Sequence, residues 1–373
     1  MIKINGKDVT AIHVGDKDVA RVMLGGSVVW EAKPKGVRLV GKFYDTTECW
    51  VYINGIEYKL PQEFDFTFDG KWTFGQKDNR AFGWVITELT YTEGVNDLES
   101  MYRMFDQAAR TARLTDLSGI SNWDVSKVTT MEKAFSSNSK LTSIDISKWR
   151  TPKCESFESM FSGCSALTEI IGIENLDVSN ATTLRAMLSG CKALGGDVLD
   201  LRKWDVSKCT TFVQLFAPTK FKAIDITGWS APNLTGSSAI EYMFSNCSEL
   251  KEIKGLETFN MPQITGWWRV FSGCTALETL NFTNRDFSKI TSFIDAFKNC
   301  TSLTTVIGPV SGISVNISLA DSPLTNDSAM VFINGLANVD TAPTITFHRD
   351  VYDALTEEQI AIATAKGWSV IRS

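Results

Sequence analysis

The side chains best suited to chemistry in this sequence are acidic and amide residues that recur at one position of a repeated pattern. Each occupies the exposed middle position of a predicted short strand, and the spacing places them in register on neighbouring strands: Asp145, Asp200, Asp225 and Asn281. Such a ladder of oxygen atoms could bind a cation such as calcium or accept hydrogen bonds from sugar hydroxyls. The alternative interpretation is a solvated polar face that binds nothing.

Cysteine is the second residue type with chemical potential, and most of the eight cysteines follow the same pattern. Five share the position three residues after a recurrent Phe or Leu: Cys164, Cys191, Cys247, Cys274 and Cys300. Cys154 and Cys209 share another position, which Val, Leu, Ile or Ala fills elsewhere. No paired CxxC occurs, and only His13 and His348 could supply imidazole ligands. We therefore predict reduced, buried cysteines that form a structural core ladder, and no metal site.

Tryptophans also recur at one position of the pattern, three residues after the last buried strand position: Trp123, Trp149, Trp204 and Trp229. A stripe of exposed aromatic rings could stack on glycans. However, Leu176, Phe259 and Arg285 fill the same position in other copies. Packing in the core or at its rim is therefore the favoured interpretation.

Motifs for catalysis are missing from the sequence. It contains no glycine-rich phosphate loop, no nucleophile elbow and no zinc motif, and neither histidine lies in a triad-like context. We therefore predict no catalytic residues and no cofactor, and we expect that the chain is not an enzyme.

The elements that must position these residues form a repeat of about 27 residues. A Phe or Leu anchor recurs at 26-residue to 30-residue intervals: Phe105, Phe135, Phe161, Leu188, Phe216, Phe244, Phe271 and Phe297. Apolar residues four before and one before each anchor have helical spacing, so a short helix is predicted there. Alternation such as Ile144-Asp-Ile146 predicts a short strand. Asp, Ser and Thr between the two predict a turn that caps the next helix.

One such unit cannot bury its own apolar face, so the units must stack and share a core. The predicted fold is an α/β leucine-rich-repeat solenoid with seven or eight turns of short strand plus short helix, over residues 96–320. Strands stacked about 4.8 Å apart would form a face roughly 35 Å long.

Two segments of the repeat carry a family resemblance. Trp-Asp-Val-Ser-Lys-Val-Thr-x-Met at residues 123–131 and Met-Phe-Ser-x-Cys-x-x-Leu at residues 160–167 resemble the BspA-like leucine-rich repeats of bacterial surface proteins, the mycoplasma-lipoprotein type. The resemblance implies adhesion or recognition at surfaces, in proteins of gut bacteria, mycoplasmas and their phages.

The ends of an array need caps, because its last units expose core and sheet edge. Residues 1–32 have a ten-residue period with glycine turns and predict a β-meander that serves as an attachment module. Residues 37–95 alternate and predict a small β-domain that covers the first repeat. Residues 321–373 predict a C-terminal cap with helix at 328–339, strand at 344–348, then helix and strand. Thr356-Glu-Glu-Gln359 reads as a capping box.

Composition excludes several classes of partner. The net charge is −6, and the 37 Lys and Arg residues are scattered, so nucleic acid is not an expected partner. No run of about 18 apolar residues occurs, so no membrane insertion is expected. The segment after Met1 enters strand-like alternation at once and shows no secretion signal.

Three functional hypotheses follow. The first is a non-enzymatic phage virion protein, a tail-fibre or receptor-binding component, whose N-terminal module binds other virion proteins and whose solenoid recognises a host surface protein or glycan. The second is a bacterial cell-surface adhesin, which would need a signal or anchor. The third is a purely structural virion component of the head or tail. By analogy with tail fibres, the chain is a possible homotrimer.

Overall fold

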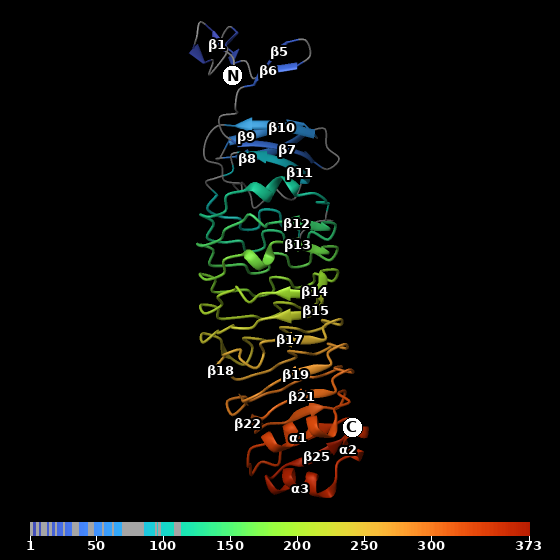
Figure 1. Cartoon of the computed structure of the whole chain (residues 1–373). Helices are drawn as coiled ribbons and strands as arrows, with labels where there is room; N and C mark the ends of the chain where they lie inside the picture. The colour runs from blue at the N-terminus through green and yellow to red at the C-terminus, as the bar shows by residue number, and fades with distance from the viewer. Residues whose placement is uncertain are drawn as a thin grey trace.

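The structure, a computed structural model, describes residues 113–373 without interruption. Before them it describes residues 3–4, 7–8, 13–14, 17–18, 21–24, 27–31, 37–43, 48–53, 56–61, 63–68, 86–93, 95 and 98–107. Figure 1 shows a chain built mainly from short strands, with successive segments stacked along one long axis toward the C-terminus.

Three short antiparallel hairpins lie near the N-terminus. They pair β1 (Lys3–Ile4) with β2 (Lys7–Asp8), β3 (His13–Val14) with β4 (Lys17–Asp18), and β5 (Arg21–Leu24) with β6 (Ser27–Glu31). Their innermost pairs begin at Ile4, Val14 and Leu24, so the hairpins follow the ten-residue period of the sequence. The glycine turns predicted between these strands lie outside the described residues.

A small antiparallel sheet precedes the repeats. Its strands, with one accompanying hairpin, are β7 (Val37–Phe43), β8 (Glu48–Ile53), β9 (Ile56–Pro61), β10 (Glu63–Phe68) and β11 (Ile86–Glu93). The order in the sheet is β10-β7-β11, and β8 pairs with β9. β11 also contacts the first repeat, because the Leu89 N–H donates to Asp116 O at 2.9 Å and Trp123 Nε1 donates to Thr92 Oγ1 at 2.7 Å.

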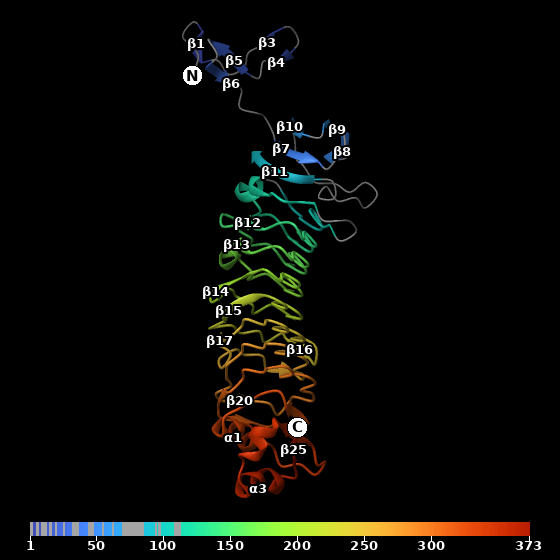
Figure 2. The same cartoon turned by 90° about the vertical axis from the view of Figure 1, so that its right-hand side faces the viewer.

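Residues 98–107 and 113–320 form a stack of coils, each about one repeat long. One side of the stack, which we call the strand side, consists of β12 (Ser143–Asp145), β13 (Glu169–Ile171), β14 (Gly195–Asp200), β15 (Lys220–Asp225), β17 (Glu252–Lys254), β19 (Thr279–Asn281) and β21 (Thr305–Ile307). The paired strands are parallel and in register, as in Asp200 opposite Asp225. In Figure 2, β12, β13, β14, β15 and β17 lie one beneath another along the left edge. The pairing is interrupted between β13 and β14 and between β17 and β19.

Smaller elements complete the coils. Two-stranded parallel pairs are formed by β16 (Thr235–Gly236) with β18 (Gln263–Ile264) and by β20 (Arg285–Asp286) with β22 (Val310–Ser311). Two 3₁₀ turns are present, η2 (Ser118–Asn122) and η3 (Ile173–Asn175).

The helix predicted around each Phe or Leu anchor is wrong. Each of these segments consists of two consecutive turns, which we call a tandem turn, and the side of the stack that they form is the tandem-turn side. The segments are residues 101–107, 131–137, 157–163, 184–190, 212–217, 240–246, 267–273 and 293–299. Within one of them, the Ala134 N–H bonds back to Met131 O at 3.0 Å. The N–H groups of Met131, Lys133 and Phe135 instead donate to carbonyls of the next coil. A helix would use these donors internally, whereas here alternate donors join coil to coil.

Backbone dihedrals explain how apolar residues at helical spacing form turns. The third residue of the first turn in each segment has a positive φ: Arg103, Lys133, Ser159, Ala186, Gln214, Tyr242, Arg269 and Asp295. The last residue of six segments has one as well: Ser137, Gly163, Gly190, Asn246, Gly273 and Asn299. A positive φ at the third residue of a hydrogen-bonded turn is the signature of a type II turn. The turn brings Met131, Ala134 and Phe135 to the interior, so their spacing matches that of a helix without helical structure.

The anchors form the centre of the core. Their rings stack from coil to coil, with centroids 5.6 Å apart for Phe105 and Phe135, and 5.3 Å apart for Phe135 and Phe161. A second run joins Phe216, Phe244, Phe271 and Phe297 in the same way. Burying each ring contributes roughly 1.5–3 kcal/mol, so the stack is stabilised along its whole length.

The α-helices of the described part of the chain all lie in the C-terminal segment, so the α/β description of the repeats is replaced by a strand-rich one. This segment contains β23 (Ile317–Leu319), α1 (Asn326–Gly335), β24 (Thr344–Phe347), α2 (Arg349–Asp353), α3 (Glu357–Ala365) and β25 (Ser369–Arg372). Thr356 and Gln359 form the expected capping box of α3. The helix predicted at 328–339 begins and ends earlier, because Thr325 supplies its N-cap. Ser328 Oγ of α1 accepts from the Val306 N–H, which joins this segment to the last coil.

Candidate functional site

The predicted oxygen ladder lies at the ends of the strand-side strands. Asp145, Asp200, Asp225 and Asn281 are half-buried and occupy equivalent positions. Their direct neighbours differ, because Asp145 pairs with Ile171, Asn281 with Ile307, and Asp225 with both Asp200 and Lys254. The structure therefore brings only Asp200 and Asp225 together, and apolar or basic residues interrupt the ladder elsewhere.

Each of these side chains caps a local turn. An Oδ1 atom accepts from the backbone N–H two residues later, at 2.9 Å for Ser147, 3.2 Å for Arg202, and 3.0 Å for both Thr227 and Thr283. Hydrogen bonds from Ser147 lower the pKa of Asp145. Bonds from Arg202 lower the pKa of Asp200 to about 2. These are local turns in which an Asp or Asn side chain satisfies the backbone.

Arg202 also bridges the one adjacent acidic pair of the ladder and offsets one of its two negative charges. Its Nη2 lies 2.7 Å from Asp200 Oδ2, and its Nε lies 3.6 Å from Asp225 Oδ2. Across the part of the chain that the structure describes, no group of three or more His, Cys, Asp or Glu side chains could hold a metal ion. The arrangement thus favours turn capping and ion pairing over cation binding for this ladder.

The strand side also carries exposed apolar side chains, which were not predicted from the sequence. Val198 is 49% exposed, and Ile171 and Ile307 are each 43% exposed. Ile171 and Ile307 occupy the very positions where the oxygen ladder is interrupted. The signal available in the sequence was therefore an apolar residue in a slot that other coils fill with Asp or Asn.

A cavity of about 260 Å³ opens beside Val198, where the pairing between β13 and β14 is interrupted. Its apolar lining includes Ile170, Ile173, Val198, Leu199 and Phe221, and its acidic lining consists of Glu169, Glu174 and Asp200. We call this cavity and its lining, together with the neighbouring exposed Ile171, the strand-side groove. Apolar surface with a few polar groups is the usual composition of a binding site.

An additional glycine accompanies each interruption of the strand pairing. Gly172 and Gly255 make their coils one residue longer, and both have a left-handed backbone, with φ of 88° and 83°. A Cβ on Gly172 would lie 2.3 Å from Ser147 Cα, so no larger residue fits there. The insertion turns the chain away from the regular ladder before the next strand can pair.

The five cysteines of the predicted core ladder lie on the tandem-turn side and are fully buried. Each Sγ donates to the carbonyl of the preceding coil's anchor, as Cys164 does to Phe135 O at 3.0 Å and Cys300 to Phe271 O at 3.2 Å. Asn138 fills the same slot and donates through Nδ2 to Phe105 O at 2.8 Å. All seven cysteines whose side chains are described are free thiols. Burial raises the pKa of Cys164 and Cys300 to about 12.

The recurrent tryptophans are buried, with Trp149 fully covered and Trp204 only 3% exposed. Their indole N–H groups donate to carbonyls of an earlier coil: Trp149 to Ile120 O, Trp204 to Ile173 O and Trp229 to Leu201 O. Their rings are therefore part of the core, and stacking on a glycan is not available to them.

The described histidine, His348, serves a local structural role. His348 Nδ1 accepts from the Asp350 N–H at the start of α2, so this side chain is an N-cap. The His13 side chain lies outside the described residues. Among the described helices, none combines the length and the apolar character needed to cross a membrane.

Comparison with known families agrees with the repeat. Residues 91–199 and 168–258 match the family described as "Mycoplasma protein of unknown function, DUF285". Residues 214–320 match the family described as "BspA type Leucine rich repeat region (6 copies)". No curated protein and no solved structure is similar enough to match this chain. The two family matches support the predicted BspA-like leucine-rich repeat, and neither description mentions a phage or a virion.

Proposed function

We propose that this chain is a non-enzymatic recognition protein of the surface-adhesin type, which uses the strand side of its coil stack to bind a component of a bacterial surface. The observation that carries the proposal is the strand-side groove. Here the regular ladder is interrupted, and apolar side chains are exposed beside acidic ones. A repeat that only stacked would not need Ile171 or Val198 in contact with water.

The match to BspA-type repeats supports the surface-adhesin class. The architecture that we propose for this function is a leucine-rich-repeat solenoid, with hairpins at one end and the cap at the other. Function in such arrays lies on the sheet face or on the loops, because the interior is filled by packing.

A more specific version of the proposal places the chain in a phage virion. In it, the hairpins at residues 3–31 attach the chain to other virion proteins, and the strand-side groove meets a protein or glycan of the host. A cell-surface adhesin would use the same groove without that attachment.

Competition with phage adsorption tests both versions. Fluorescently labelled full-length protein should bind intact cells of the bacterial host saturably. If the virion version holds, unlabelled protein at saturation should also reduce adsorption of the phage to those cells. Saturable cell binding with unchanged adsorption would leave the adhesin version alone. Absence of cell binding would contradict the recognition proposal and favour a purely structural role.

A further inference from the structure

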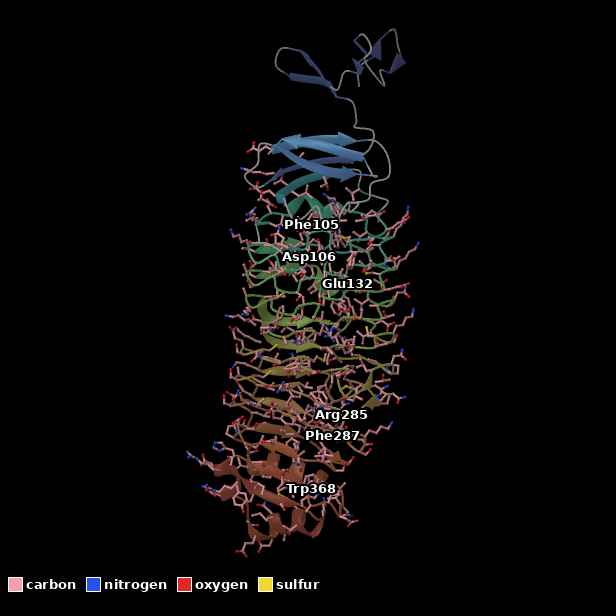
Figure 3. All side chains as sticks on the ribbon, turned by 180° about the vertical axis from the view of Figure 1, so that it is seen from behind. Phe105, Asp106, Glu132, Arg285, Phe287 and Trp368 are labelled. Carbon is pink, nitrogen blue, oxygen red and sulfur yellow. The ribbon has the colours of Figure 1, made fainter. Side chains whose placement is uncertain are left out.

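Arg285 stands in the slot that tryptophan fills in other coils. Its backbone N–H donates to Phe282 O at 2.8 Å, just as the N–H of Trp229 donates to Ile226 O at 3.0 Å. Its guanidinium also replaces the indole as a donor. Nη2 bonds to Leu256 O, the counterpart of the Ile173 O that Trp204 contacts, and Nη1 bonds to Phe259 O at 2.8 Å. Figure 3 shows Arg285 and Phe287 close together near the C-terminal end of the stack.

The substitution places a positive charge where other coils have a neutral ring. Arg285 is partly buried, and desolvation lowers the pKa of its guanidinium. Glu257, in the lining of the neighbouring cavity, is the acidic residue whose charge acts on this guanidinium, and the Nε of Arg285 is buried without a partner. Desolvation outweighs that attraction, so a neutral residue would serve the packing better.

A cavity of about 340 Å³ adjoins this guanidinium. Apolar residues line it, including Met261, Ile264, Trp267 and Phe287. Polar residues lie around it: Glu257, Asn260, Asn284, Asp286 and Lys289. The volume falls at the lower end of the range for small-molecule sites, roughly 300–1,000 Å³.

The N–H groups of Arg285 that have no partner indicate the chemical class of the ligand. A guanidinium has five N–H donors in a fork; two of those of Arg285 donate to carbonyls and Nε–H is buried, which leaves two for an anion. A planar carboxylate matches that fork. The amides of Asn260 and Asn284 offer both donors and acceptors, and Asp286 offers acceptors, which together suit the hydroxyl groups of a sugar.

We propose that this cavity binds an acidic sugar, with the carboxylate of one uronic-acid unit against Arg285 and its hydroxyls against the surrounding amides. The site is separate from the strand-side groove and does not depend on it. If the recognition role also holds, the cavity identifies an acidic glycan as one component of the recognised surface.

The proposal is tested by titrating the full-length protein with D-glucuronate and D-galacturonate. Binding is monitored by calorimetry or by NMR. Saturable binding of at least one uronate is expected, with D-glucose at least tenfold weaker because it lacks the carboxylate. No saturable uronate binding would overturn the proposal. Acetate binding as tightly as the uronates would overturn the sugar assignment.

Three variants locate the site. Arg285→Trp restores the residue of the other coils, so the fold should be retained, as judged by the thermal midpoint, while uronate binding weakens at least tenfold. Arg285→Lys keeps the charge without the fork and should weaken binding less. Arg185→Ala removes an exposed arginine of the tandem-turn side and should leave binding unchanged. A folded Arg285→Trp protein that binds uronate normally would exclude this cavity.

The uronate titration and the cell-binding assay can fail separately. Substitution of Ile171 and Val198 in the strand-side groove should leave uronate binding unchanged, because neither residue lines the cavity beside Arg285. Uronate binding that disappeared in that variant would contradict a separate site.

Discussion

The tandem-turn side and the strand side of the coil stack differ in how the backbone hydrogen bonds between neighbouring coils are made. On the tandem-turn side, the backbone hydrogen bonds between coils continue across all eight segments. In most coils, a side-chain donor of the following coil, such as Cys164 or Asn138, also bonds to the anchor carbonyl. On the strand side, the ladder is interrupted twice, at coils lengthened by Gly172 and Gly255. The comparison indicates that the hydrogen-bond ladder is continuous on one side and interrupted on the other, where Val198 lines a cavity.

The largest expected effect concerns the buried thiols of the tandem-turn side at alkaline pH. Below the ordinary thiol pKa of about 8.5, the thiols are neutral in both folded and unfolded protein. Between that value and the raised pKa of about 12 in the fold, only the unfolded chain loses the proton, so stability falls as pH rises. Each thiol then contributes a loss of up to about 1.4 kcal/mol per pH unit, and the losses of the five thiols have the same sign.

Denaturant titrations between pH 8 and 10.5 measure this slope. Cys164→Asn, which introduces the residue of the equivalent slot at 138, should reduce the slope by about 1.4 kcal/mol per pH unit. Because lysines and tyrosines also titrate in this range, the difference between variant and parent is the quantity to compare. An identical slope would show that the thiol does not cause the alkaline loss.

Shortening a buried anchor sharpens the comparison between the two sides. Phe161→Ala removes a ring stacked on Phe135 and should lower the free energy of unfolding by about 3–5 kcal/mol. Val198→Ala on the strand side should change it by about 0.5 kcal/mol or less, because Val198 is half exposed. Chemical denaturation of both variants measures the difference. Similar losses would remove the distinction between a stabilising side and a binding side.

A smaller change in the free energy of unfolding is expected for substitutions at the position that Asn138 shares with the cysteines. Asn138→Ala leaves the Phe105 carbonyl without its side-chain donor and should cost about 1–3 kcal/mol. Asn138→Cys should cost less, because five other coils use a thiol at this position. If both variants lost the same free energy, the slot would require only volume and not a donor.

Much of this fold follows from the sequence, and the exceptions have physical reasons. The anchors, the alternation around Ile144 and the position shared by the cysteines all report burial, which periodicity detects directly. The tandem turns were mistaken for helices because Met131, Ala134 and Phe135 have the same spacing in both. The left-handed residues of the first turns, such as Lys133 and Gln214, are not glycine and gave no turn signal. Gly163, Gly190 and Gly273 end three of the segments with a positive φ and were a turn signal that the helical interpretation left unused.

The candidate sites were less accessible to sequence reasoning. Asp145, Asp200, Asp225 and Asn281 were correctly aligned with one another, but their turn-capping bonds depend on backbone N–H groups that a sequence does not place. The strand-side groove depends on a one-residue insertion at Gly172 and on a break in pairing. Arg285 was visible as an exception in the tryptophan slot, yet the lack of a partner for its buried Nε could be seen only in the structure.

The smallest expected effect concerns calcium. Arg202 lies between the adjacent Asp200 and Asp225 of the ladder and occupies the space that a cation would need, so millimolar calcium, or its removal by a chelator, should leave the thermal midpoint within about 1 °C. Differential scanning calorimetry at constant ionic strength measures the shift. A stabilisation by calcium that disappears in Asp200→Asn would restore the ladder as a cation site.

The most direct test of the strand side as a recognition surface is saturation binding of full-length variants to intact bacterial cells. Ile171→Ser combined with Val198→Ser alters exposed side chains of the strand-side groove, whereas Ile362→Ser, the control, alters an exposed isoleucine of α3. We predict that the double variant keeps the parent's thermal midpoint and loses at least tenfold in apparent affinity, and that the control binds like the parent. Equal cell binding by all three proteins would contradict the account.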